Sequence, residues 1–202
     1  MSNPGYSDPI DHAFAFVAKH YADATGFGPA TTNRSANLAV TLARYGCDEP
    51  TVVAGVLLSL LDACPIDRRS GMEAKVNEKF GPAVLVSVRD ATEPHYDPEG
   101  RRRGWRTSKQ EFLVHLLDAD PRALDVVTAN EIHWCGSSLT IVRRLGPEYL
   151  PIGSGVALTD IEWWHGSLAE LLATRSDWRR RDMLEQLRAT SAAVARAMHE
   201  SS

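Results

Sequence analysis

The sequence is poor in cysteine, and its few thiols show no paired spacing. Cys47, Cys64 and Cys135 are the three cysteines among 202 residues, and no C-x-x-C or zinc-finger pattern surrounds them. This argues against a disulfide scaffold and against a cysteine-based zinc site. A sparse, odd number of thiols is typical of proteins in a reducing compartment, so we expect a cytoplasmic protein.

Long apolar runs and a strong charge of one sign are also missing. No stretch reaches the roughly 18 apolar residues of a membrane span, and the first residues lack the order of a signal peptide. The formal net charge of −4 argues against a nucleic-acid partner. Two runs of three arginines, at 101–103 and 179–181, are interpreted as solvated faces and not as phosphate sites. We therefore predict no membrane and no nucleic acid as partners.

The sequence also lacks alternating β-strand patterns, and the residues that separate its apolar segments are typical of helix ends. Apolar residues recur at helical spacing in segments separated by Gly, Pro and capping residues. The segment 52–61 is apolar on every side, which predicts a buried central helix. The exception is 94–104, a Pro- and Gly-containing stretch that we expect to be a long and functional loop. The fold class predicted is all-α.

Several side chains are expected to begin helices. Asp48 and Asp120 precede apolar segments and are predicted N-caps. Ser70, Thr107 and Thr159 each stand three residues before Glu or Gln, which is the pattern of a capping box, so helices are expected to start there as well.

Five phrases together resemble one family. They are similar to the hydrolase domain of the bacterial Rel/SpoT enzymes and to the small alarmone (guanosine polyphosphate) pyrophosphohydrolases, which belong to the HD-domain family. The phrases are LAVTLARYGCDEPTVVAGVLL (38–58), KFGPAVLVSVRDATEP (79–94), GWRTSKQEFLVHL (104–116), TANEIHW (128–134) and IEWWHGSLAELL (161–172). The resemblance implies an HD-domain-like helical bundle over 1–175, with a C-terminal helical extension over 176–202 that packs on it.

The residues that hold the metal in that family are replaced here. The family binds a divalent cation, usually manganese, through an early histidine, a His-Asp pair and a later aspartate. Counting from Gly46 places Arg34 at the first position and Leu58-Ser59 at the pair, and Asn130 takes the place of the later aspartate. None of the four positions keeps a family ligand, so the metal-binding motif is degenerate.

The replacements are hostile to a cation. Leu58 has no lone pair, while Ser59 and Asn130 are neutral and weak ligands. Arg34 is permanently charged. Its repulsion of a divalent ion about 4 Å away is on the order of 8 kcal/mol at an effective dielectric constant near 20. We therefore predict no metal and no other cofactor.

Part of the family's polar site persists. Asp62 matches the first member of a carboxylate pair, Lys109 matches a basic residue, and His133 matches the histidine of the ADKLHN-type phrase. Asp62 and His133 are the candidate catalytic acid and base. The alternative is that Asp62 is a structural partner and that His133 supports packing.

The candidate ligand-binding residues are Arg34, Ser59, Lys109 and Asn130. Arg34 has two possible roles: it anchors an anionic ligand, or it fills the former metal position and pairs with Asp62. Cys64, on the same turn as Asp62, is either a nucleophile or an inert buried thiol. Trp163 and Trp164 either stack a base or form core or pocket wall.

Three functions follow from these observations. The first is a pseudoenzyme that binds a nucleotide-like or other anionic small molecule. The second is a metal-independent lyase, cyclase or transferase that uses the old cavity. The third, which requires the alignment to be wrong, is a metal-dependent phosphohydrolase. A homo-oligomer is compatible with each of the three.

Overall fold

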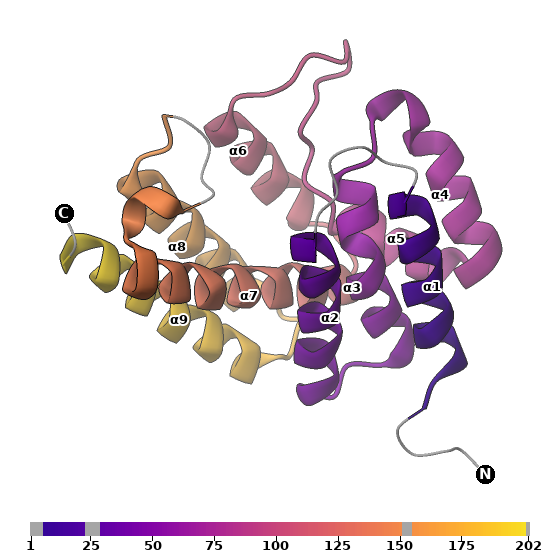
Figure 1. Cartoon of the computed structure of the whole chain (residues 1–202), viewed down its shortest axis with the longest axis horizontal. Coiled ribbons are helices and arrows are strands. Elements are labelled where there is room, and N and C mark those ends of the chain that lie inside the picture. Colours follow the sequence, from indigo (N-terminus) through magenta and orange to yellow (C-terminus); the bar gives the residue numbers. More distant parts are fainter. Residues whose placement is uncertain (1–5, 23–28, 151–154, 201–202) are drawn as a thin grey trace.

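The computed structural model describes residues 6–22, 29–150 and 155–200, and within these ranges the chain is all-α. Figure 1 shows the arrangement of the helices. Their bounds are α1 (Asp8–Ala22), α2 (Pro29–Arg44), α3 (Glu49–Asp62), α4 (Ile66–Phe80), α5 (Pro82–Asp90), α6 (Trp105–Leu116), α7 (Pro121–Leu145), the 3₁₀ turn η1 (Pro147–Tyr149), α8 (Leu158–Thr174) and α9 (Arg181–Glu200).

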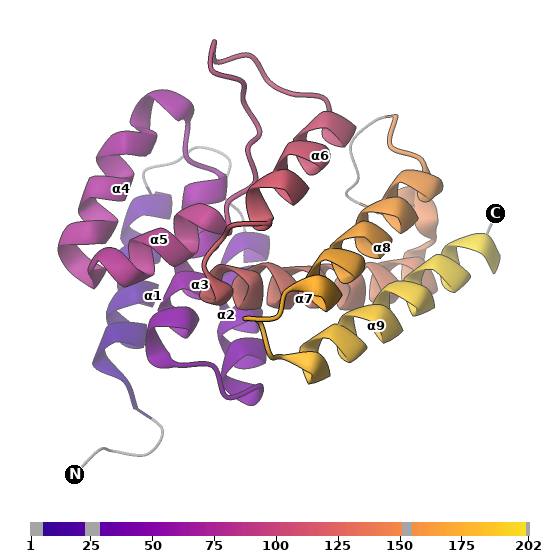
Figure 2. The ribbon, with the colours of Figure 1, turned by 180° about the vertical axis from the view of Figure 1, so that it is seen from behind.

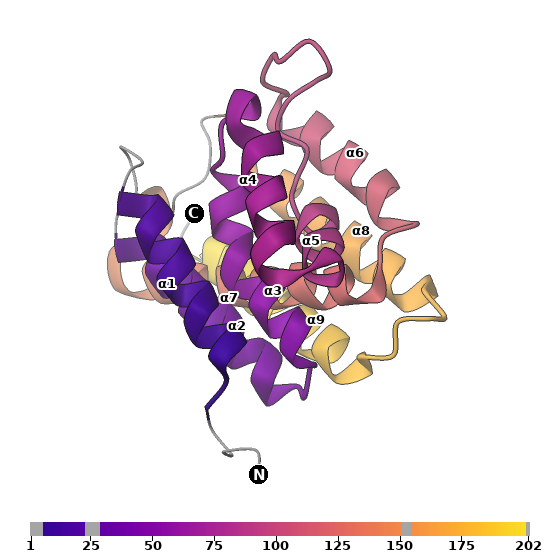
Figure 3. The ribbon, with the colours of Figure 1, turned by 90° about the vertical axis from the view of Figure 1, so that its right-hand side faces the viewer.

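Helix α3 is the buried centre, as its composition predicts. Every residue from Thr51 to Leu61 is buried, and α3 contacts α1, α2, α5 and α7. Figure 3 shows α3 and α5 between α1 and α2 on one side and α6 and α8 on the other. The apolar surface of α3 is therefore removed from water on all sides, which stabilises the packing of the surrounding helices on it.

Helix α7 joins two halves of the molecule, α1 to α5 on one side and α6, α8 and α9 on the other. It packs on α2, α3 and α5 at one end and on α9 along its length, while α8 lies against α9 and α6. Figure 2 shows α6 and α8 side by side above α7, with the loop between α5 and α6 projecting beyond them. A helix that contacts both halves places its side chains between them.

The two predicted N-caps are confirmed. The Asp48 carboxylate accepts the backbone N–H of Thr51 at 3.1 Å, and the Asp120 carboxylate accepts that of Arg122 at 2.8 Å. Each satisfies a backbone donor that the first helical turn leaves unpaired. These caps fix where α3 and α7 begin.

The three predicted capping boxes are wrong. Ser70, Thr107 and Thr159 lie inside α4, α6 and α8, which begin upstream at Ile66, Trp105 and Leu158. At α8 the backbone N–H of Ala157 instead donates to the Asp160 carboxylate at 3.2 Å. The S/T-x-x-E/Q pattern also occurs within a helix, so it does not locate the first residue without the backbone geometry.

Residues beyond 175 share the main core. Trp178, Met183, Leu184 and Leu187 are buried in the same apolar cluster as the side chains of α3. The Arg175 guanidinium donates to three backbone carbonyls, those of residues 116, 117 and 119, at 2.7 to 2.9 Å. The segment before α9 is therefore anchored to the end of α6 as well as to the core.

Among the described residues, no helix has both the length and the apolar character that a membrane span requires.

Candidate functional site

A cavity of about 790 Å³ opens between α2, α3, α6, α7, α8 and the loop that precedes α6. Its lining combines aromatic and charged side chains. The aromatic residues are Trp105, Phe112, Trp134 and Trp164. The polar and charged residues of the lining include Arg34, Asp62, Glu93, His95, Arg102, Lys109, Asn130, Glu131 and His133.

Five of the six predicted site residues line this cavity: Arg34, Asp62, Lys109, Asn130 and His133. Ser59 does not. It is only 1% exposed within α3, and its hydroxyl oxygen has no hydrogen-bond partner among the described residues. Its neighbour Leu58 is equally buried. Position 59 therefore belongs to the core of α3 and makes no contact with the cavity.

Arg34 ties three helices together. From α2, its Nη2 donates to Asp62 Oδ2 on α3 at 3.0 Å, and its Nε donates to Asn130 Oδ1 on α7 at 2.8 Å. The pairing with Asp62 is one of the two roles considered above for this arginine. Both partners are part-buried, which makes the hydrogen bonds stronger than those of a solvated pair.

The residues at the four positions that the resemblance assigns to a metal do not fit a divalent cation. Arg34 and Asn130 are in direct contact, so a guanidinium stands beside the neutral amide that replaces the last ligand. Leu58 and Ser59 are turned into the core. Within the described part of the chain, no group of three or more His, Cys, Asp or Glu side chains is placed to hold a metal ion.

Lys109 is buried beside both a carboxylate and an indole. Its Nζ bonds Glu93 Oε2 at 2.7 Å, and it lies 4.1 Å from the ring centroid of Trp164. The residue is 8% exposed. A desolvated ammonium requires such compensation, which the carboxylate and the face of the indole ring supply together.

Glu131 is the second buried carboxylate near Lys109. It accepts hydrogen bonds from Trp164 Nε1 at 3.0 Å and from Asn130 Nδ2 at 3.2 Å, and it lies 3.2 Å from His165 Nε2. Burial opposes its ionisation, but the positive charge of Lys109 and the bonds from His165 and Trp164 lower its pKa to about 2. Glu131 is therefore ionised at neutral pH.

His95 connects the two ion pairs across the cavity. One ring nitrogen lies 3.8 Å from Asp62 Oδ1 and the other lies 3.7 Å from Glu93 Oε1. His95 comes from the loop at 94–104. Sequence reasoning identified that loop as functional, but it did not single out this residue.

These residues form a series around the cavity, called the polar ring below, in which the charge of Lys109 acts on Glu131 without an ion-pair contact between the two. In order around the cavity its members are Arg34, Asp62, His95, Glu93, Lys109, Glu131 and Asn130. The ring draws on α2, α3, α6, α7 and the loop before α6. Hydrogen bonds within the ring join α2 to α3 and to α7, and they join α6 to the loop that precedes it.

His133 lies outside the polar ring but lines the same cavity. It is half-buried, and no hydrogen bond of its ring is found among the described residues. Burial, together with the positive charge of Arg34, lowers the pKa of His133. At neutral pH its imidazole is therefore uncharged and retains a lone pair that is available to a ligand or a proton.

Cys64 agrees with the interpretation as an inert buried thiol, and Trp164 agrees with that as a pocket wall. Cys64 is 8% exposed, and burial raises its pKa, so the thiol is a poor nucleophile. Trp164 is 2% exposed and stacks on Phe112 with ring centroids 6.1 Å apart. It forms the wall between the core and the cavity.

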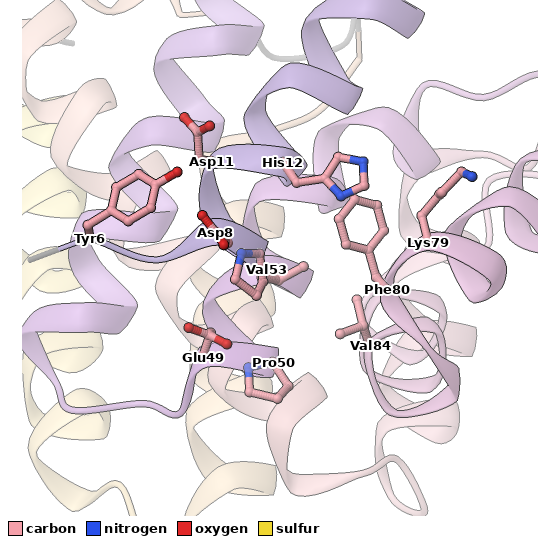
Figure 4. A pocket seen from close by; sticks show the side chains of 11 residues that line it. Tyr6, Asp8, Asp11, His12, Glu49, Pro50, Val53, Lys79, Phe80 and Val84 are labelled. Atoms are coloured by element: carbon pink, nitrogen blue, oxygen red, sulfur yellow. The ribbon is translucent and has the colours of Figure 1, made fainter. Parts of the chain in front are cut away.

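A second cavity, of about 530 Å³, lies where α1 meets the start of α3 and the end of α4 (Figure 4). Tyr6, Asp8 and Asp11 stand on one side of it, and Lys79 stands on the other, beyond the ring pair of His12 and Phe80. None of the predicted site residues lines it. We take the larger cavity as the candidate site because the paired charges, the aromatic wall and the free imidazole converge there.

No known family model matches the chain, and no curated protein matches it. In fold, the chain is similar to lmo0812 from Listeria monocytogenes EGD-e, known from a crystal structure, with a TM-score of 0.63 at 16% sequence identity. The similarity covers 82% of this chain and 99% of that one. At this identity the likeness concerns the fold alone, so the chain shares an all-α architecture with a solved bacterial protein.

Proposed function

We propose that the chain is a pseudoenzyme of the HD type that binds a nucleotide-like or other anionic small molecule in the central cavity without a metal ion. The observation that carries the proposal is the contact of Arg34 with Asn130, 2.8 Å apart. Both stand at metal positions by resemblance. The contact brings these positions together across 96 residues of sequence, and it puts a guanidinium where a cation would be repelled.

The residues that line the cavity indicate what kind of molecule it accepts. Trp105 and Trp134 are partly exposed there, and a flat ring stacks favourably on an indole. Arg34, Asn130 and the unpaired imidazole of His133 offer polar contacts. A nucleotide combines a flat ring with an anionic group and so suits both kinds of contact.

A ligand screen with a blocked cavity tests this proposal. Guanosine tetraphosphate, common nucleotides and organic acids are tested by thermal shift in the presence of EDTA. Ser137→Trp places an indole at the exposed edge of the cavity, and Thr140→Trp puts the same side chain on an exposed part of α7 outside it. We expect stabilisation of the wild type and of Thr140→Trp, but not of Ser137→Trp. Equal stabilisation of all three proteins would place binding elsewhere.

The alternative is a metal-independent lyase, cyclase or transferase, and one observation favours it. His133 is uncharged and free of hydrogen bonds among the described residues, and Asp62 lines the same cavity. A neutral imidazole and a carboxylate are suited to move a proton between two atoms of a bound molecule. Product formation from a ligand found in the screen, followed by NMR and lost in His133→Ala, would favour the enzyme over the pseudoenzyme.

A cytoplasmic location and a homo-oligomeric state also remain proposals. All three cysteines are free thiols, which fits a reducing compartment. Light scattering after size-exclusion chromatography measures the oligomeric state directly.

A further inference from the structure

The loop before α6 carries three consecutive arginines on a short hairpin. Tyr96 and Arg102 form an antiparallel bridge, and the backbone N–H of Arg103 donates to the carbonyl of His95 at 2.9 Å. The tip is closed by Asp97, whose carboxylate accepts the backbone N–H of Arg101 at 2.8 Å. The backbone of the three arginines is thus held in place by hydrogen bonds within the loop.

The first and third arginines are neutralised by their own surroundings. Arg101 pairs with Asp97 at 2.7 Å and with Glu99 at 3.0 Å, and its side chain is 75% exposed. Arg103 pairs with Glu111 at 2.6 Å. Neither residue lines the central cavity.

Arg102, between them, differs in both respects. It lines the central cavity, and its side chain has no ion pair or hydrogen bond with any residue that the structure describes. The other two cations of the cavity, Arg34 and Lys109, each have a carboxylate at 3.0 Å or less. Arg102 is an exposed residue, and among the described residues it is the one lysine or arginine of the cavity lining without a carboxylate partner.

The net charge of the polar ring makes the unpaired Arg102 important for binding an anion. The ring contains two cations and three carboxylates, so with His95 neutral its formal charge is −1. An incoming anion is repelled by this charge, because the positive charges of the ring are already balanced at contact distance. Arg102 brings the lining to zero and supplies an unsatisfied positive group.

We propose that Arg102 is the residue that binds the anionic group, phosphate or carboxylate, of the ligand, while Arg34 and Lys109 maintain the polar ring. This rests on the proposed function. A guanidinium presents parallel N–H donors that match two oxygens of a phosphate or carboxylate. The proposal moves the anion contact from Arg34 to the arginine run that was interpreted from the sequence as a solvated face.

The test compares neighbouring arginines that have the same chemistry but different surroundings. Wild type, Arg102→Gln and Arg101→Gln are titrated by calorimetry, in EDTA, with guanosine tetraphosphate as the phosphate probe and citrate as the carboxylate probe. We expect Arg102→Gln to weaken whichever probe binds about ten- to hundred-fold, the usual effect of losing a charge-assisted contact. Arg101→Gln removes the same charge from the same loop and should change the affinity less than two-fold.

The first two outcomes below test the assignment to Arg102 alone, and the third tests it together with the proposed function. If Arg102→Gln binds as the wild type does while Ser137→Trp does not bind, the anion contact is wrongly assigned but the cavity still binds the ligand. If both glutamine variants weaken binding equally, the effect is one of general charge, and the assignment to Arg102 is wrong. If the wild type binds neither these probes nor any other anion of the screen, both proposals are wrong.

Discussion

Helix α7 carries two buried carboxylates in opposite environments. Glu131 faces the central cavity, and Asp125 faces the segment that leads into α9. Each accepts an indole N–H, Glu131 from Trp164 at 3.0 Å and Asp125 from Trp178 at 2.7 Å. Burial raises the pKa of Asp125, whereas the pKa of Glu131 is lowered to about 2.

The difference comes from the balance between burial and the groups around each carboxylate. At Glu131 the charge of Lys109 and the bonds from His165 and Trp164 outweigh burial, whereas at Asp125 burial outweighs Arg180, whose Nε lies 3.7 Å from Oδ2. The Arg180 guanidinium also donates to the backbone carbonyls of Tyr45 and Gly46. Both carboxylates accept an indole N–H, but their roles differ. Glu131 keeps a negative charge beside the cavity. Asp125 accepts the indole N–H where the segment before α9 meets α7, a contact called the joint below.

The largest effect is expected at this joint. Trp178 is 1% exposed and belongs to the main core, so Trp178→Ala leaves a cavity and removes the indole donor of Asp125. We expect a loss of about 3–5 kcal/mol in the free energy of unfolding, measured by urea denaturation. Trp163→Ala is the control, because Trp163 is only partly buried against the core. Equal losses in the two variants would show that the joint has no special role.

The next effect concerns Glu131. A carboxyl whose pKa falls from 4.5 to about 2 on folding contributes on the order of 3 kcal/mol of stability. That contribution is fully present above the unfolded pKa and is lost as the pH falls through the folded value. Glu131→Gln should therefore remove about this amount at pH 7, and it should flatten the decline in stability between about pH 4.5 and pH 2. An unchanged pH profile would contradict the assignment of the charge to Glu131.

The smallest effect is expected for Asp125→Asn. The folded pKa of Asp125 is raised, so its ionised form is disfavoured by folding, and stability is lost as the pH rises through that pKa. The amide keeps an acceptor for Trp178 and removes the buried charge. We expect a change below about 1 kcal/mol at pH 7, or a gain, by urea denaturation. A loss as large as that of Glu131→Gln would abolish the contrast between the two carboxylates.

Most of the fold could be predicted from local patterns. The apolar segment at 52–61 and the caps Asp48 and Asp120 depend on neighbours close in sequence, and all three predictions agree with the structure. The capping-box pattern failed at Ser70, Thr107 and Thr159, because it is also compatible with the interior of a helix.

The candidate site could be predicted only in part. Resemblance brought Arg34, Asp62 and Asn130 together correctly, because their positions follow the order of the helices. It could not place Ser59 in the core, because α3 is buried on all sides up to Leu61 and lines the cavity only through its last residue, Asp62. His95 was missed, since its position beside Asp62 of α3 depends on how the loop before α6 folds back over the cavity.

The charges around Glu131 could not be predicted either. The sequence shows a glutamate at position 131, but it does not show that the positive charge of Lys109 acts on it. A compensating pair of this kind depends on contacts between helices, which spacing along one helix does not reveal.

The most direct measurement is a titration of the wild-type protein with manganese alone, followed by thermal shift and calorimetry. Arg34 contacts Asn130 at 2.8 Å, so a divalent cation at this position would meet a fixed positive charge and no carboxylate or imidazole from the family's ligand positions. We expect no stabilisation and no stoichiometric heat, while an anionic ligand stabilises the protein in EDTA. A clear stabilisation by manganese alone would contradict the account and favour a metal-dependent phosphohydrolase.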